Sequence, residues 1–241
     1  MKIAELFAAK TRDNWNAPGV TIAFLGDSVT QGCFEIYKTS PDTLETVFDK
    51  NNAYHAHLAR MLAELFPSVP VNIVNAGVSG SNAQHGLERL ERDVIAHRPD
   101  LAVVCFGLND CGGGTEKLDD YIAALDGIFS RLAEENTETI FMTPNMMCTS
   151  VSCHLTDEML RSIADGCAKL QNEGVLDAYV AAANKLCAKR RVAVCDCYAK
   201  WKALEKSGAN ITELLANKIN HPTRSMNRLF AYSLLETMLG E

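Results

Sequence analysis

The sequence predicts an α/β fold, a three-layer α/β/α sandwich in which helices cover both faces of a parallel sheet. Two observations lead to this. Five short apolar runs alternate with stretches of helical periodicity along the whole chain, and no Pro-, Gly- or Ser-rich linker interrupts them. The chain has 241 residues, of which 47% are hydrophobic and 22% charged, so it can bury one sizeable core.

The five apolar runs are short enough to be strands. Because each is apolar almost throughout, rather than in alternation, we expect strands covered on both faces. They occupy residues 20–26, 71–74, 101–106, 139–143 and 192–196.

The stretches between these runs place apolar residues three and four positions apart, the spacing of one helix face. They cover residues 53–66, 84–97, 121–132 and 224–239, with a longer region from about 157 to 191 that breaks near 172–174. Strands that alternate with helices in this way form right-handed crossovers. We therefore predict a flavodoxin-like sheet of five parallel strands, ordered 2-1-3-4-5.

The remaining segments fit one domain that spans residues 1–241. Residues 1–18 form an N-terminal helical extension, since the first 15 residues read as a short amphipathic helix. Residues 33–52 are polar and too long for a tight connection, so we expect a loop over the functional site.

Composition excludes several classes of function. The net charge is −7 without a basic run, which argues against nucleic acid as a partner. No stretch approaches about 18 uncharged apolar residues, so no membrane span is expected. The N-terminus lacks the apolar core of a secretory signal, and the nine cysteines are irregularly spaced. A reduced, cytoplasmic protein is the interpretation we favour.

The cysteines do not form a metal-binding pattern. No C-x₂-C pair is present, and Cys195 and Cys197 lie two positions apart in a predicted strand. We expect Cys195 and Cys197 to flank the sheet rather than to share a metal ion as ligands. Neither a metal nor an organic cofactor is expected.

Four polar or glycine-containing blocks follow the strands or precede the last helix. A serine just past a buried strand lies at the carboxyl edge of the sheet, where open α/β folds bind ligands. Alone, such a serine is also typical of a helix N-cap. All four blocks can meet at this edge: residues 26–28 (Gly-Asp-Ser), 75–81 (Asn-Ala-Gly-Val-Ser-Gly-Ser), 107–110 (Gly-Leu-Asn-Asp) and 220–222 (Asn-His-Pro).

In this order the blocks resemble those of the GDSL or SGNH hydrolases, from about residue 21 to residue 239. The resemblance implies that Ser28 is the nucleophile and His221 its general base. It also implies that the backbone of Ser28 and Gly80, with the Asn109 amide, forms an oxyanion hole. These residue types suit the chemistry, because a serine hydroxyl needs an adjacent base and neutral N–H donors stabilise an oxyanion.

One position departs from the family pattern. The family has an aspartate three residues before the histidine, where this sequence has Lys218, whose ammonium cannot accept the imidazole N–H. Three alternatives remain: the amide oxygen of Asn217, a backbone carbonyl in the 217–220 turn, or a dyad of Ser28 and His221. We favour a dyad steadied by a neutral acceptor, with Asn217 as the candidate side chain.

Three further polar residues flank the presumed catalytic ones. Asp27, Asn75 and Asp110 are expected to brace the loops through hydrogen bonds to the backbone.

These observations predict a serine esterase that removes a short acyl group, such as acetyl, from a carbohydrate or small alcohol through an acyl-enzyme on Ser28. One alternative is an acyltransferase that uses the same acyl-enzyme. The other is a non-catalytic carbohydrate- or partner-binding module on a decayed hydrolase fold. Lys218, in place of the family's aspartate, favours this alternative. The oligomeric state leaves no trace in the sequence.

Overall fold

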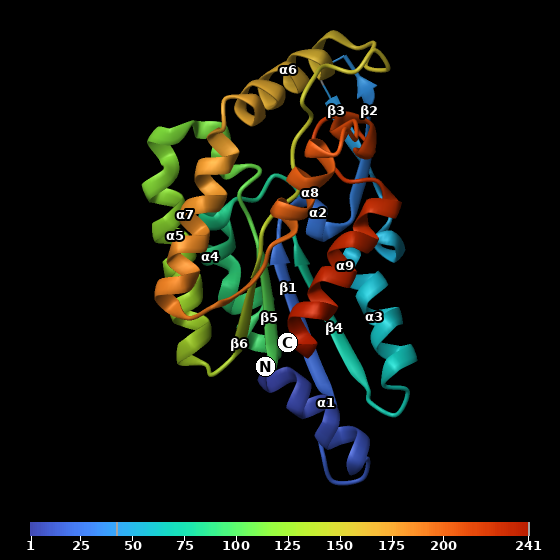
Figure 1. Ribbon diagram of the computed structural model, residues 1–241, viewed down its shortest axis with the longest axis vertical. Coiled ribbons are helices and arrows are strands. Elements are labelled where there is room, and N and C mark those ends of the chain that lie inside the picture. Colours follow the sequence, from blue (N-terminus) through green and yellow to red (C-terminus); the bar gives the residue numbers. More distant parts are fainter. Residues whose placement is uncertain (42, 241) are drawn as a thin grey trace.

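The computed structural model describes residues 1–41 and 43–240. Within them, five parallel strands form one sheet in the order β4-β1-β5-β6-β7. Counted among themselves these strands follow 2-1-3-4-5, and helices cover both faces of the sheet (Figure 1), so the predicted fold class is confirmed. The strands are β1 (Val20–Gly26), β4 (Val71–Gly77), β5 (Leu101–Cys105), β6 (Glu138–Met142) and β7 (Ala193–Cys195).

The central strands show why the apolar runs are continuous. Every side chain of β5 is buried, and in β1 only Thr21 is partly exposed. A parallel strand with helices on both sides has no solvent face, so polar alternation would bury unpaired groups. In register, Gly26 of β1 lies beside Gly77 of β4 and Cys105 of β5, which brings three carboxyl ends to one edge.

Two layers of helices enclose the sheet (Figure 1). On one side α3 (Tyr54–Leu65) packs against α9 (Arg224–Leu239), and on the other α5 (Leu118–Glu134) packs against both α4 (Ala83–Asp93) and α7 (Val175–Arg190). The remaining longer helices contact these layers: α1 (Lys2–Arg12) and α8 (Cys197–Lys206) touch α9, and α6 (Glu158–Asn172) touches α7.

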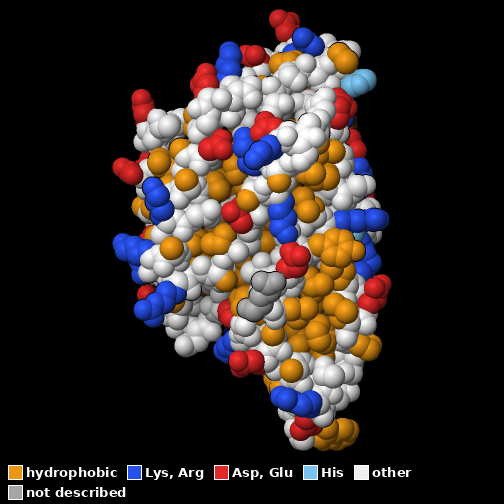
Figure 2. Space-filling model, in the orientation of Figure 1, with side chains coloured by type: hydrophobic (Ala, Val, Ile, Leu, Met, Phe, Trp, Pro, Cys, Tyr) orange, Lys and Arg blue, Asp and Glu red, His pale blue; other side chains and the backbone are white. Residues whose placement is uncertain are grey.

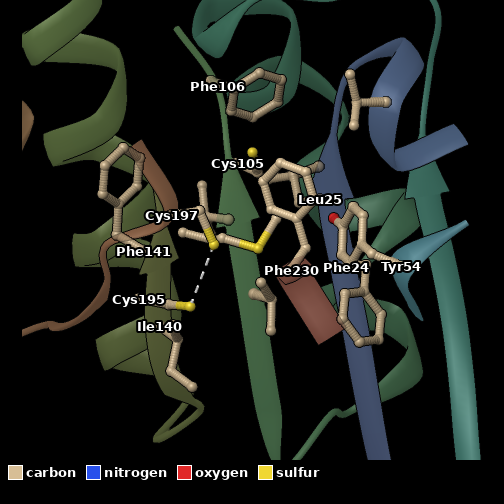
Figure 3. Close-up of a cluster of buried hydrophobic side chains, with 14 of the residues drawn as sticks. Phe24, Leu25, Tyr54, Cys105, Phe106, Ile140, Phe141, Cys195, Cys197 and Phe230 are labelled. Carbon is tan, nitrogen blue, oxygen red and sulfur yellow. Dashed lines mark hydrogen bonds between the residues drawn. The ribbon is translucent and has the colours of Figure 1, made fainter. Parts of the chain in front are cut away.

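Aromatic side chains join the sheet to the α3–α9 layer (Figure 3). The Tyr54 ring lies 5.7 Å from that of Phe24 on β1 and 5.9 Å from that of Phe230 on α9. All three are fully buried, and aromatic burial contributes strongly to a core. These contacts fix α9 relative to β1, and with it the segment that precedes the helix.

The helix predictions hold with small shifts of their ends. Residues 224–239 form α9 as predicted, and the long region divides into α6 and α7 at Gly174, whose φ of +76° suits glycine. Helix α8 lies outside the predicted helices and follows β7 almost directly.

The prediction of a loop over residues 33–52 is wrong. This segment is a β-hairpin of β2 (Cys33–Ser40) and β3 (Thr43–Phe48), followed by a 3-10 turn at Lys50–Asn52. The last four side chains of β2 are all exposed and β3 mixes half-buried with exposed side chains, so their polar composition resembles that of a loop. At its base, the N–H of Asp49 donates to the carbonyl of Gly32 at 2.8 Å.

The expectation that Cys195 and Cys197 flank the sheet is also wrong. Strand β7 ends at Cys195 and α8 begins at Cys197, so the chain turns between them. Their sulfur atoms lie 3.7 Å apart and both side chains are buried (Figure 3). Both thiols are free.

The surface carries charges of both signs. On the face seen in Figure 2, basic and acidic side chains are interspersed between apolar ones. Across residues 1–41 and 43–240, no helix is both long enough and apolar enough to span a bilayer.

Candidate active site

Ser28 lies where β1 gives way to the short helix α2 (Ser28–Gln31). The N-cap of α2 is Asp27 rather than Ser28, and its carboxylate accepts the N–H of Val29 at 2.9 Å. Ser28 is therefore not used to cap the helix, which leaves its hydroxyl available for another partner. Its side chain lies in a nearly closed environment, with 6% of the residue exposed.

That partner is His221. The hydroxyl of Ser28 lies 2.9 Å from Nε2 of the imidazole, although the two residues are 193 positions apart in the chain. His221 is 4% exposed and lies in the segment just before α9. The sequence placed both residues at one edge of the sheet, and the structure brings their side chains into hydrogen-bond contact.

The other imidazole nitrogen faces a backbone carbonyl. Nδ1 of His221 lies 2.9 Å from the oxygen of Phe34, the second residue of β2 in the β2–β3 hairpin. A carbonyl only accepts, so Nδ1 must carry the proton and donate it. Nε2 is then unprotonated and accepts the hydroxyl of Ser28, which is the tautomer that a general base requires.

Asn217 does not supply this acceptor, which corrects the expectation for that residue. Its amide oxygen accepts the backbone N–H groups of Ile219, Asn220 and His221 at 3.0, 2.9 and 2.9 Å. Asn217 thus shapes the turn that carries His221 instead of touching its ring. Lys218, at the position of the family's aspartate, has a φ of +60° and pairs with Glu213 at 2.8 Å.

The contact between Phe34 and His221 could not be predicted from the sequence, for a physical reason. It contributes a main-chain oxygen, which every residue carries, so no side-chain pattern marks it. The only available signal was positional: Phe34 follows Ser28 closely, in a segment expected to lie over the site.

Burial sets the protonation of the base. Burial lowers the pKa of the His221 imidazole below its ordinary value of 6.5, because a charge is poorly solvated there. The hydrogen bond to the Phe34 carbonyl and the charge of Glu35 oppose this shift in part. The net direction keeps His221 neutral, and thus basic, at neutral pH.

The loops that carry Gly80 and Asn109 lie together. Gly80 has a φ of +74°, in the left-handed region, within the turn that closes with the Ser81 N–H donating to the Val78 carbonyl at 3.1 Å. The side-chain amide of Asn109 donates one hydrogen to the carbonyl of Ser81 at 2.8 Å. An amide nitrogen has two hydrogens, so the second stays available to another acceptor.

The loop after β4 is also tied to the segment that carries Ser28. The N–H of Val78 donates to the carbonyl of Gly26 at 3.1 Å, and that of Ser79 donates to the side chain of Gln31 at 2.7 Å. The Asn75 amide nitrogen lies 3.4 Å from the carbonyl of Gln31. The residues just before Gly80 are therefore tied to the last residue of β1 and to the last residue of α2.

Two carboxyl groups support these loops, that of the half-buried Asp110 and that of the buried Asp27. Asp110 accepts the N–H of Ala83 at the start of α4 at 2.9 Å, and burial raises its pKa to about 6. Asp27 is 1% exposed, and burial, with a smaller contribution from the charge of Asp110, raises its pKa to about 7. Both contact backbone N–H groups, the arrangement expected of bracing residues.

Comparisons with known proteins bear on this geometry. Residues 24–229 match the model of the GDSL-like lipase/acylhydrolase family. Over 92 residues the chain is 29% identical to an acetylxylan esterase of Geobacillus stearothermophilus, a match that spans 38% of this chain and only 40% of that relative.

Solved structures show the same fold. The crystal structure of an acetylxylan esterase from Geobacillus stearothermophilus superposes with a TM-score of 0.66 and 22% identity, covering 93% of this chain and 96% of the other. An acetyl xylan esterase named AlAXEase superposes with a TM-score of 0.65 and 18% identity, covering 90% and 98%. At identities this low, the structural similarity shows the fold alone.

Proposed function

Because this chain belongs to the GDSL-like lipase/acylhydrolase family and is an ester hydrolase, we propose that it removes a short acyl group, such as acetyl, from a carbohydrate or small alcohol. Ser28 is the nucleophile and His221 the general base in this proposal. One observation carries it: the buried contact of 2.9 Å between the Ser28 hydroxyl and Nε2, with Nδ1 held by a carbonyl.

The proposed reaction has two halves. In the first, the oxygen of Ser28 bonds to the ester carbonyl carbon while Nε2 of His221 takes the hydroxyl proton. The tetrahedral intermediate then collapses, the bond to the alcohol oxygen breaks, and His221 returns the proton to that oxygen. In the second half, water replaces the alcohol and the same proton transfers release the acid and Ser28.

Neutral donors stabilise the negative oxygen in both halves. The backbone N–H groups of Ser28 and Gly80 and the second amide hydrogen of Asn109 are assigned this role. The amide of Asn109 is already oriented by its bond to Ser81, so it loses little freedom when it binds the oxyanion.

A carbonyl in place of a carboxylate has a cost in rate. The Phe34 oxygen selects the correct tautomer, but it stabilises the positive imidazolium less than a full negative charge would. The neutral arrangement lowers the rate without removing it, because triad members contribute unequally.

The substrate class rests on the relatives. Both similar structures and the partial sequence match carry the name acetylxylan esterase, which supports an acetylated saccharide as the substrate. The nearly closed setting of Ser28 agrees with a small acyl group.

Turnover of p-nitrophenyl esters of increasing chain length, and of an acetylated xyloside, tests the proposal. We expect the acetyl ester to be preferred, and Ser28→Ala and His221→Ala each to lower kcat by about 10³-fold or more. Ser162→Ala and His97→Ala, at exposed positions on α6 and before β5, are matched controls with wild-type rates.

Mass spectrometry of the intact protein under turnover adds a direct readout. An acetyl adduct that maps to Ser28 and is absent from Ser28→Ala supports the acyl-enzyme. A folded wild-type protein that turns over none of these esters, or a Ser28→Ala variant that retains activity, would contradict the proposal.

A further inference from the structure

An arginine and two carboxylates lie directly beside the acceptor of the His221 imidazole. The guanidinium of Arg224 donates to both oxygens of Glu35, at 2.6 and 3.1 Å, and its Nε donates to Asp49 at 2.8 Å. The same guanidinium lies 4.4 Å from the centre of the Phe34 ring. These four residues, Arg224, Glu35, Asp49 and Phe34, are called the Arg224 clamp below.

The clamp joins the same two segments as the catalytic hydrogen bond. Arg224 is the first residue of α9 and follows His221 by three positions, while Glu35 directly follows Phe34 in β2. One segment therefore supplies both the imidazole and the guanidinium, and the other supplies both acceptors. A movement that separated Nδ1 from the Phe34 oxygen would also have to open the ion pairs.

We propose that the Arg224 clamp is a positioning device, which holds the Phe34 carbonyl against Nδ1 of His221 and so fixes the tautomer of the general base. This inference rests on the proposed function of Ser28 and His221. Arg224, Glu35 and Asp49 are positioning residues in it, since none of them contacts the reacting atoms.

The clamp is one of several contacts that place the hairpin, since Cys33 and Phe34 are buried at its base and Lys38 pairs with Asp157 at 2.9 Å. A two-stranded hairpin is only marginally stable by itself, so its placement depends on contacts with the rest of the molecule. Inside the hairpin, Cys33 pairs with Phe48, and the Thr46 hydroxyl donates to the Glu35 carbonyl at 3.0 Å. These contacts hold the two strands to each other, whereas the clamp holds them to α9.

Geometry, more than stability, is what the clamp contributes. The side chains of Arg224, Glu35 and Asp49 are 37%, 45% and 24% exposed, and ion pairs in such settings add little to the free energy of folding. A planar guanidinium that is held from two sides and lies over a ring is, however, fixed in direction. Removing it should therefore change catalysis more than folding.

Steady-state kinetics on p-nitrophenyl acetate test the inference. We expect Arg224→Ala to lower kcat about 10-fold while KM changes less than about 2-fold, because the base is displaced but the acyl pocket is retained. Arg228→Ala is the matched control: it removes the same charge one turn along α9, from an exposed side chain with no ion pair among the described residues.

A double-mutant cycle asks whether the clamp acts as one unit. If it does, Arg224→Ala with Glu35→Gln lowers kcat no further than Arg224→Ala alone. Arg224→Lys and Glu35→Gln are milder changes that keep the inference testable if Arg224→Ala fails to fold, and each is expected to lower kcat by a smaller factor.

Proton NMR provides a readout independent of turnover. The Nδ1–H resonance of His221, assigned by its loss in His221→Ala, should shift or broaden in Arg224→Ala and remain in place in Arg228→Ala. An unchanged resonance with unchanged kcat, or an equal loss of kcat in Arg228→Ala, would overturn the inference. An inactive wild type in which the resonance still responds to Arg224→Ala would instead count against the proposed function alone.

Discussion

A main-chain oxygen orients the proposed base of this hydrolase, and that choice shapes what single residues can do. The bond from Nδ1 of His221 to the Phe34 carbonyl survives any substitution of the Phe34 side chain that leaves the backbone in place. A carboxylate in that position would raise the pKa of the imidazole by its charge, whereas the carbonyl raises it by hydrogen bonding alone. Burial therefore prevails, and the pKa of His221 is lowered.

The acid limb of the rate profile follows from this shift. The His221 imidazole must be unprotonated to act as a base. Because its pKa lies below 6.5, most of it stays unprotonated when the pH falls to 6.5. We expect kcat/KM for p-nitrophenyl acetate to hold near pH 6.5 and to fall only at lower pH. Asp27→Asn separates this limb from the titration of Asp27, whose raised pKa lies close by. A midpoint above 6.5 in both proteins would show that the imidazole is not desolvated as argued.

Asn109 offers a second test at a single residue. Its second amide hydrogen is assigned to the oxyanion, which exists only after attack, so Asn109→Ala should lower kcat by about 10²–10³-fold and leave KM nearly unchanged. Asn172→Ala is a suitable control, because the amide of Asn172 also donates to a backbone carbonyl, that of Thr149 at 3.0 Å. A rise in KM at constant kcat would assign Asn109 to substrate binding instead.

The helices and strands differ in how well they can be predicted from the sequence. The strands β1 and β5 and the helix α9 are visible because burial on both faces, or on one face, imposes an apolar period. The β2–β3 hairpin is not, since its strands are half-exposed and its placement depends on Arg224, a residue almost two hundred positions away. Ser28 and His221 could be named from the sequence because their blocks resemble those of a known family, whereas no such pattern marks Phe34 or the clamp.

The same substitution at two glycines should have opposite effects on stability. Gly32 ends α2 with a φ of +95°, and an added Cβ would lie 3.2 Å from the Cα of Lys50. Gly32→Ala should lower the free energy of unfolding by about 1–3 kcal/mol. It should also lower kcat, since the hairpin with Phe34 starts at the next residue.

Gly166 is the matched control in this comparison. It lies inside α6, with open space around the position of a Cβ, so Gly166→Ala should raise the free energy of unfolding by about 0.5–1 kcal/mol. Urea denaturation of both variants gives the two values. Equal signs would mean that backbone conformation does not decide stability at Gly32.

At the scale of the whole molecule, polar groups lie together at the carboxyl edge of the sheet, next to the hydrophobic core. The carboxyl ends of β1, β4 and β5 meet there by register, and hydrogen bonds tie the block after β4 to α2 and the block after β5 to the Ser81 carbonyl. This convergence follows from strand order and could be predicted. The turn that brings the sulfur atoms of Cys195 and Cys197 together could not, because it depends on where β7 stops.

Asp27 links this edge to global stability. Its carboxyl group has a pKa raised to about 7 by burial, against an ordinary value of 3.8. Between these two values the folded protein holds a proton that the unfolded chain releases, so the free energy of unfolding should fall as the pH rises from about 4 to about 7. The contribution of Asp27 is complete below this window and is lost above it.

Asp27→Asn isolates that contribution, because the amide oxygen can still accept the N–H of Val29 but does not titrate. Compared with the wild type, the variant should gain about 2–4 kcal/mol between about pH 4 and about pH 8, since each unit of pKa shift corresponds to about 1.4 kcal/mol. Urea denaturation at several pH values measures the difference, with the exposed Asp119→Asn as a control whose pH dependence should parallel the wild type. If the Asp27→Asn curve ran parallel as well, Asp27 would be ionised in the folded protein throughout, and a buried anion beside Ser28 would then have to be counted in the electrostatics of the site.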